Sequence, residues 1–168
     1  DGTRMVTGSH DGTTRLWDAV EGKPIGSIMK HKHAGYVSSA VFSHDGLRIL
    51  TLYDDTLSGR DKNAHLWDGK TGQPIGAPMN AWYQGSAVFS PDGTRIVTIC
   101  GDQKVRLWAG ATGQSLDLVM AHADMVNRAV FSSDGNLILT ASDDKTARLW
   151  DAKSGKAVGP ILEHQGKV

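Results

Sequence analysis

The chain has 168 residues and carries 18 basic side chains (Lys and Arg) against 18 acidic ones (Asp and Glu), so its formal net charge is zero. This balance excludes the basic footprint of a nucleic-acid-binding protein, and no apolar run has the length that a membrane span requires. A single cysteine, Cys100, excludes an intramolecular disulfide framework. No signal segment opens the sequence, and we expect a cytoplasmic location.

Short β-prone runs separated by turn residues follow one another along the chain, and no helix of useful length is indicated. In the first unit we expect strands at Arg4–Ser9, Thr13–Asp18 and Ile25–Met29. The second unit is expected to contain Tyr36–Ser43, Leu47–Tyr53, Ala64–Asp68 and Ile75–Met79. The third is expected to contain Ser86–Ser90, Thr94–Cys100, Lys104–Trp108 and Leu116–Met120. The fourth is expected to contain Val126–Ser132, Asn136–Ser142, Thr146–Asp151 and Ala157–Leu162.

The same short sequences return at nearly constant intervals. AVFSHDG (40–46), AVFSPDG (87–93) and AVFSSDG (129–135) match one another, as do RLWD (15–18), HLWD (65–68), RLWA (106–109) and RLWD (148–151). The tryptophans of the second set are 50, 41 and 42 residues apart. A period near 42 that is built from short strands predicts a propeller-type array, because one such unit cannot bury both of its sheet faces alone.

These motifs resemble the WD-repeat family, whose marks are the Trp-Asp dipeptide, an upstream Asp-x-Thr and an upstream His. The resemblance implies an all-β propeller made of four-stranded antiparallel blades, with strands a to d running from hub to rim. It covers the whole chain as four repeats, of which the first and the last are incomplete. We expect the units at about 1–32, 33–79, 80–121 and 122–163, with a further unit starting at 164–168.

One constellation recurs in every repeat: a Thr, an Asp and a Trp at fixed spacing. The sets are Thr7, Asp11 and Trp17; Thr98, Asp102 and Trp108; Thr140, Asp144 and Trp150; and, with six extra residues inserted, Thr51, Asp61 and Trp67. A histidine precedes two of the repeats (His33 and His122), Asn80 takes its place in the third unit, and His164 opens a further unit. A buried indole N–H needs an acceptor, and a Thr hydroxyl can accept it and donate onward. The resemblance implies structural His–Thr–Asp–Trp networks in units two and four, from which Asn80 departs.

Other interpretations of these residues are possible. Thr, His and Asp together could form a catalytic triad, but their repetition in every unit favours a scaffold. His31 and His33 could bind a metal, although His33 already has a structural place. The stretch 54–61 resembles a calcium loop but lacks the EF-hand spacing, so a solvated loop is preferred. Cys100 ends a strand pattern and is interpreted as a small buried residue rather than as a reactive thiol. We expect no cofactor and no metal.

In the family, the loops from strand d to a and from b to c share one face that commonly binds partners. Here that face should carry His10, Lys32, Tyr36, Arg60, Trp82, Tyr83, Asp124, Met125 and Asp143. Trp82 is the one Trp outside the repeated position, and beside Tyr83 and Arg60 it has a hot-spot composition; capping the hub is the alternative. We therefore expect a non-catalytic scaffold that binds a protein or peptide. A self-assembling propeller fragment is the alternative, and a propeller enzyme comes third.

The two ends of the sequence are complementary. Three strands of type a are expected against four each of b, c and d. His164 lacks a Thr, Asp and Trp downstream, whereas Thr7, Asp11 and Trp17 lack a His upstream. We expect either a part of a longer propeller or association with a second copy into a pseudo-eight-bladed ring, in which His164 approaches Asp11 of the other copy. If four blades closed on themselves, His164 would instead reach Thr7 or Asp11 of its own chain.

Overall fold

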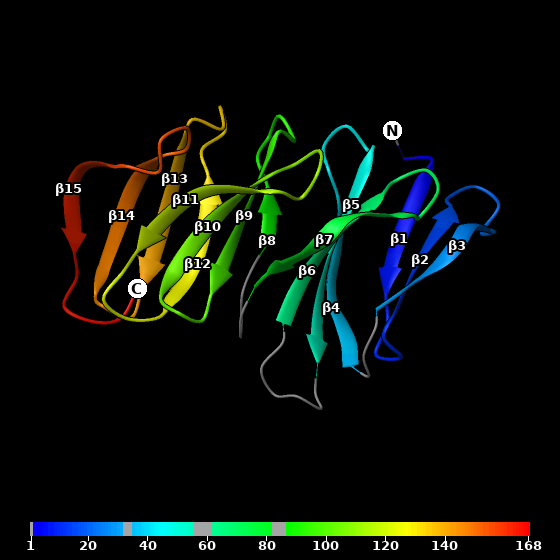
Figure 1. Ribbon diagram of the computed structural model, residues 1–168, viewed down its shortest axis with the longest axis horizontal. Helices are drawn as coiled ribbons and strands as arrows, with labels where there is room; N and C mark the ends of the chain where they lie inside the picture. Colours follow the sequence, from blue (N-terminus) through cyan, green and yellow to red (C-terminus); the bar gives the residue numbers. More distant parts are fainter. Residues whose placement is uncertain (1, 32–34, 56–61, 82–86) are drawn as a thin grey trace.

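The computed structural model describes residues 2–31, 35–55, 62–81 and 87–168 (Figure 1). The predictions made for Lys32, His33, Arg60, Asp61, Trp82 and Tyr83, and for residues 56–61 of the calcium-like stretch, lie outside these ranges. In the described ranges the chain forms fifteen strands and no helix, so none of their segments is a helix that could span a membrane.

Four antiparallel sheets follow one another along the chain. Sheet one has the order β1-β2-β3 and consists of β1 (Arg4–Gly8), β2 (Thr13–Asp18) and β3 (Pro24–Lys30). Sheet two consists of β4 (Gly35–Phe42), β5 (Arg48–Asp55), β6 (Lys62–Asp68) and β7 (Pro74–Asn80). Sheet three consists of β8 (Ala87–Phe89), β9 (Arg95–Cys100), β10 (Lys104–Ala109) and β11 (Ser115–Ala121). Sheet four consists of β12 (Val126–Phe131), β13 (Leu137–Ser142), β14 (Thr146–Asp151) and β15 (Ala157–Glu163).

The predicted strands are confirmed to within two residues at each end. The turns between the first two strands of a sheet explain much of this regularity. In sheet two, the Ser43 hydroxyl donates to the Asp45 carboxylate at 2.5 Å, and Gly46 closes the turn with φ of 66°. A residue without a Cβ adopts this conformation at little cost. The Ser43 hydrogen bond also lowers the pKa of Asp45 to about 2, which keeps the acceptor ionised.

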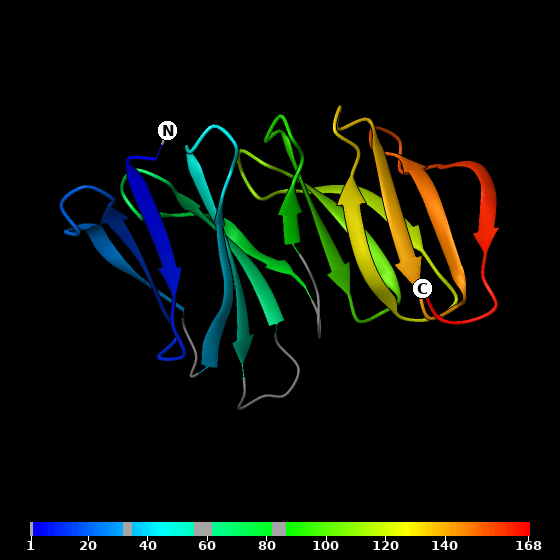
Figure 2. The same cartoon turned by 180° about the vertical axis from the view of Figure 1, so that it is seen from behind.

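The four sheets stand side by side in chain order, with sheet one at one end of the row and sheet four at the other (Figures 1 and 2). Strands β1 and β15 therefore lie at opposite ends of the row, and the four sheets do not close on themselves. The alternative in which His164 reaches Thr7 or Asp11 of its own chain is consequently wrong for this structure.

The hydrophobic core is divided into layers between consecutive sheets. Leu16 and Met29 of sheet one pack with Ile49 and Trp67 of sheet two. The same arrangement recurs between sheets two and three and between sheets three and four. We call the face that meets the next sheet the leading face (Leu16 and Met29 in sheet one). The face that meets the preceding sheet is the trailing face (Ile49 and Trp67 in sheet two).

Candidate functional site: hydrogen-bond networks and the loop face

Sheet four brings together the four side chains that the repeat pattern singles out there. Nε1 of Trp150 donates to the Thr140 hydroxyl at 2.8 Å, and that hydroxyl lies 2.7 Å from Nε2 of His122. Nδ1 of His122 lies 2.8 Å from the Asp144 carboxylate. A fifth residue, Thr146, donates to Asp144 through both its backbone N–H (2.9 Å) and its hydroxyl (2.6 Å). The network therefore ties the segment before β12 to β13 and β14.

The geometry of this network favours a structural role. Burial raises the pKa of Asp144, but hydrogen bonds from Thr146, Ala123 and His122 outweigh it and hold the pKa well below its usual range. The Thr140 hydroxyl already accepts the indole N–H, and its residue is fully buried. A nucleophile has to reach a substrate, which Thr140 cannot do in this position. The arrangement satisfies buried polar groups and fixes the loop positions.

Sheet two differs from the expectation in its histidine. Nε1 of Trp67 donates to the Thr51 hydroxyl at 2.9 Å, as the spacing predicts. The histidine ring beside that hydroxyl is His31, whose Nε2 lies 3.5 Å from Thr51 Oγ1. His33 and Asp61, the other two expected members, lie outside the described residues. From the sequence, His31 is a candidate metal ligand only, and its place beside Thr51 is not predicted.

His31 is packed among aromatic rings. Its ring stacks on Tyr53 with centroids 4.4 Å apart and meets His65 edge-on at 4.5 Å. Burial, and then the nearby His65, lowers the pKa of His31 to about 3. No residue in the described ranges forms a hydrogen bond with the buried Nδ1 of His31. Among the described residues no group of three or more His, Cys, Asp or Glu side chains could hold a metal ion.

Sheet three keeps only part of the pattern. Nε1 of Trp108 donates to the Thr98 hydroxyl at 2.9 Å. Asp102, however, binds the Arg106 guanidinium through both oxygens at 2.9 and 2.6 Å, and this contact lowers the pKa of Asp102. Lys104 stands two residues after Asp102, where Thr146 stands in sheet four, so no hydroxyl at this position competes for the carboxylate. Asn80 ends β7, and its side chain lies outside the described part.

The thiol of Cys100 belongs to this sheet as well. The residue is buried, as the strand pattern predicts, and its Sγ lies 3.7 Å from the Thr98 hydroxyl. A buried thiol beside a hydroxyl behaves as a small core residue.

Sheet one holds the same pattern without a histidine. Nε1 of Trp17 donates to the Thr7 hydroxyl at 2.9 Å. Thr13 donates to Asp11 through its backbone N–H (2.9 Å) and its hydroxyl (2.6 Å). Hydrogen bonds from Thr13 lower the pKa of Asp11. In the described part of the chain, no histidine forms a hydrogen bond with Thr7 or Asp11.

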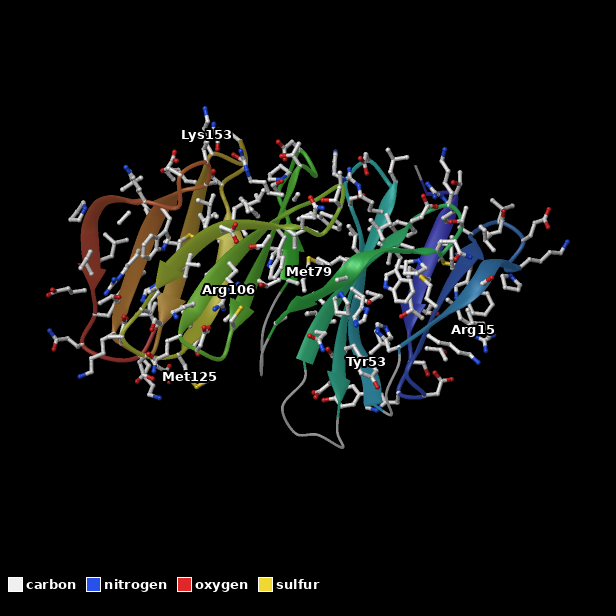
Figure 3. The ribbon with its side chains drawn as sticks, viewed as in Figure 1. Arg15, Tyr53, Met79, Arg106, Met125 and Lys153 are labelled. Carbon is white, nitrogen blue, oxygen red and sulfur yellow. The ribbon has the colours of Figure 1, made fainter. Side chains whose placement is uncertain are left out.

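The loop face is the edge of the row that carries the β1–β2, β9–β10 and β13–β14 turns. Figure 3 shows Tyr53 and Met125 at this edge and Lys153 at the opposite one. Two of the predicted partner-binding residues meet here, because the rings of His10 and Tyr36 stack with centroids 4.8 Å apart and planes 9° from parallel. The Tyr36 hydroxyl donates to the Asp54 carboxylate at 2.7 Å, which holds this ring in place.

The remaining predicted loop-face residues that the structure describes, Asp124, Met125 and Asp143, lie on sheet four. Met125 is exposed, and its backbone N–H donates to the Asp124 carboxylate at 2.8 Å. Its carbonyl accepts from the Asp143 N–H at 2.8 Å. The Asp143 carboxylate forms an ion pair with Lys167 and accepts from Asn127 at 2.7 Å, contacts that lower the pKa of Asp143. Lys167 and Asn127 have no repeated pattern, so sequence reasoning missed them.

Comparison with known proteins agrees with the repeat pattern. The model of the family described as WD domain, G-beta repeat matches residues 1–18, 22–68, 85–109 and 113–151. Autophagy-related protein 16 of Arabidopsis thaliana is 38% identical over 71 residues, which are 42% of this chain and 12% of that protein. Human angio-associated migratory cell protein is 36% identical over 78 residues, which are 45% of this chain and 16% of that protein. The chain thus spans only a small part of these relatives.

A solved structure shows the same fold. The chain as a whole superposes on 49% of the chain of the computationally designed Ika8 protein, with a TM-score of 0.75 and 22% sequence identity. This likeness concerns the fold alone. Together with the family match over most of the sequence, it agrees with the four twisted sheets and their repeated Trp–Thr hydrogen bonds. The chain belongs to the WD-repeat family and is built as an all-β array of propeller blades.

Proposed function

We propose that this chain is a non-catalytic scaffold that binds a protein or peptide partner on its loop face, in the cytoplasm. WD repeats in general mediate protein–protein interactions and are non-enzymatic. The observation that supports the proposal is the stacked His10–Tyr36 pair, which Asp54 orients at the junction of sheets one and two. A rigid aromatic pair beside a carboxylate loses little conformational entropy on binding and offers both apolar and polar contacts.

The test uses a displayed library of random peptides as the probe. Peptides selected on the wild-type chain should lose at least about tenfold in affinity on Tyr36→Ala, since a truncated hot-spot residue costs roughly 1–2 kcal/mol or more. Lys153→Ala, on the opposite edge, is the matched control and should leave the affinity unchanged. Selected peptides that bind Tyr36→Ala and the wild type equally would place the binding surface elsewhere.

A second patch of the loop face is proposed from the sequence pattern. If Trp82, Tyr83 and Arg60 form a binding patch, replacing all three with Ala should leave folding intact and abolish capture of the selected peptides. Urea unfolding and peptide affinity are measured on the same triple variant. A triple variant that unfolds at a much lower urea concentration than the wild type would show that these residues belong to the core.

A separate observation supports self-association as a second function. Among the described strands, no sheet covers the trailing face of sheet one or the leading face of sheet four (Figures 1 and 2). Met5 is 48% exposed, whereas Ile138, which occupies the same place in sheet four, is 0% exposed. Leu139 is 39% exposed, whereas its counterpart Leu50 is 1% exposed. The same apolar positions are thus buried inside the row and uncovered at its two ends.

Uncovered faces of this kind mark interaction sites, because burying them removes apolar surface from water. Further blades of a longer propeller could cover them, as could a second copy of this chain. We propose the second copy, since every interface inside the row already packs a leading face on a trailing face. The described row has one free face of each type, and both faces carry exposed apolar side chains.

A further inference from the structure

The network of sheet one matches that of sheet four in every distance that can be compared. The indole N–H of Trp17 reaches Thr7 over 2.9 Å, against 2.8 Å for the equivalent bond in sheet four. Thr13 donates to Asp11 at 2.9 and 2.6 Å, the two values found for the equivalent pair in sheet four. The difference is the histidine, which bridges Thr and Asp in sheet four. Sheet one is therefore arranged for a histidine that the described part of its own chain does not supply.

His164 stands at the other end of the row in the position of a bridging histidine. Its backbone N–H donates to the Lys145 carbonyl at 2.8 Å, just as that of His122 donates to the Gln103 carbonyl at 3.1 Å. Each carbonyl belongs to the residue directly after the Asp of its repeat. This residue is Lys145 in sheet four and Gln103 in sheet three. His164 thus has the same placement relative to sheet four that His122 has relative to sheet three.

The residues after His164 continue along the same path. The Val168 N–H donates to the Ser142 carbonyl at 3.1 Å. The Val37 N–H, at the start of sheet two, donates to the equivalent carbonyl of Ser9 at 3.0 Å. The Asn127 amide also donates to the Val168 carbonyl at 2.8 Å, which holds this segment on sheet four. The segment 164–168 therefore already runs where the first residues of a following sheet run.

Building on the self-association proposed above, we propose that two copies join head to tail and that His164 of one copy completes the Thr7–Asp11–Trp17 network of the other. The leading face of sheet four packs on the trailing face of sheet one of the second copy. His164 then stands before that sheet as His122 stands before β12. Its Nδ1–H donates to the Asp11 carboxylate, and its Nε2 accepts a hydrogen bond from the Thr7 hydroxyl. The oxygen of that hydroxyl still accepts the indole N–H of Trp17.

This joint differs in kind from an ordinary two-fold dimer contact. It joins two different surfaces, so it is heterologous, and such contacts close into a ring when the rotation between copies allows it. Two copies place eight sheets in succession, which is within the range of about four to eight blades that propellers use. Each copy would then contribute one histidine to the other copy, and both free faces would be covered.

The test separates the two faces by mutation. Leu139→Asp charges the leading face of sheet four, and Met5→Asp charges the trailing face of sheet one. Both side chains are exposed in the single chain, so we expect each variant to fold and to sediment as a monomer at micromolar concentration. An equimolar mixture should form a dimer, because each variant retains the face that the other needs. Val119→Asp, equally exposed on β11 of an interior sheet, is the control and should behave as the wild type.

The outcomes are distinct. If either variant dimerises alone, or if the mixture stays monomeric, the head-to-tail joint is wrong. Circular dichroism checks that each variant is folded, and Leu162→Asp on the same exposed leading face replaces Leu139→Asp if that variant unfolds. Neither result bears on the loop-face proposal, which is tested separately by measuring peptide affinity.

The role of His164 is tested in the same mixture. The intact joint uses His164 of the Met5→Asp chain and Thr7 of the Leu139→Asp chain. His164→Ala in the Met5→Asp chain should raise the dimer Kd about tenfold, as expected for losing a hydrogen bond to a charged group. The same substitution in the Leu139→Asp chain should leave the Kd unchanged. If the mixture dimerises but the two placements of His164→Ala have equal effects, self-association stands and the shared network is overturned.

Discussion

At the scale of single residues, the repeated Trp–Thr hydrogen bond is the contact that most clearly links sequence to structure. Sheet four carries its most complete version, in which Thr140 serves both Trp150 and His122. A buried hydroxyl that serves two partners couples them, because the loss of one leaves the others imperfectly satisfied. The networks should therefore respond to mutation as units and not as separate bonds.

We predict this coupling for Trp150 and Thr140. Trp150→Phe and Thr140→Val should each cost roughly 1–3 kcal/mol of unfolding free energy, because each leaves a buried polar group without its partner. The double variant should cost clearly less than the sum, since the second substitution removes a group that the first had already orphaned. Urea unfolding of all four proteins measures the cycle. Additive losses would show that the two side chains act independently.

His31 predicts a specific dependence of stability on pH. Its pKa is lowered to about 3 in the folded chain, whereas in the unfolded chain it is protonated near its ordinary value of 6.5. The unfolded state therefore binds more protons between these values, so stability falls as the pH drops from 6.5 toward 3. The contribution of this one residue is at most about 1.4 kcal/mol per pH unit, and it is constant above pH 6.5.

The variant His31→Phe keeps an aromatic ring against Tyr53 but cannot titrate. Its unfolding free energy should fall less steeply than that of the wild type between pH 6.5 and pH 5, when both are measured by urea unfolding. Identical pH profiles for the two proteins would contradict the assignment of a neutral, buried His31.

The sequence predicts the residues of these networks unequally well. The set Trp150, Thr140, Asp144 and His122 could be predicted, because its spacing recurs and its donors and acceptors match one another. The position of His31 beside Thr51 could not be predicted, because His31 and His33 stand two residues apart and either ring could reach the Thr51 hydroxyl. Where Lys104 replaces the Thr of Asp-x-Thr, the carboxylate binds Arg106 instead, a contact that depends on three-dimensional proximity.

At the scale of strands, each outer strand contains one residue with a left-handed backbone conformation. Two of these residues allow the effect of local backbone strain to be compared with the effect of packing between sheets. Gly76 in β7 has φ of 68°, and a Cβ there would lie 2.3 Å from the Thr112 carbonyl oxygen of sheet three. Gly159, at the same place in β15, has φ of 73° and open space around it. Both positions disfavour a side chain through the backbone, but only Gly76 is also blocked by a neighbouring sheet.

We predict that Gly76→Ala destabilises the chain by about 1–3 kcal/mol more than Gly159→Ala, because it adds the cost of overpacking. The comparison is made in the Leu139→Asp background, which should be monomeric, so that Gly159 keeps its open surroundings. Urea unfolding gives both values. Equal losses would mean that backbone strain alone decides the outcome and that sheets two and three do not press together here.

Strand positions could be predicted almost completely from the alternation of turn residues and β-prone runs. The Ser-x-Asp-Gly corners mark the ends of the inner strands because side chain and backbone together specify one turn. The bulge in each outer pairing, for example between Ala147 and Leu149, could not be predicted. It depends on how the outer strand twists against its neighbour and leaves no fixed residue signature, since Asp117 occupies the left-handed position in β11.

At the scale of the whole molecule, the repeat count predicts the number of sheets, and the complementary ends of the sequence predict a row that does not close on itself. A period near 42 residues requires stacking of like units, and the three buried layers show that stacking. The angle between neighbouring sheets arises from side-chain volumes in those layers, which a repeat pattern does not encode directly. What the structure adds is the identity of the side chains that are exposed on the two uncovered faces, such as Met5 and Leu139.

The head-to-tail joint depends on one requirement, that each sheet has a neighbour on both of its faces. Light scattering of the wild-type chain at micromolar concentration, with elution resolved by size, tests it most directly. We expect a mass of twice the 18.0 kDa of one chain, with no species above the dimer once both faces are covered. A soluble, stable particle of 18.0 kDa that persists across the concentration range would contradict it.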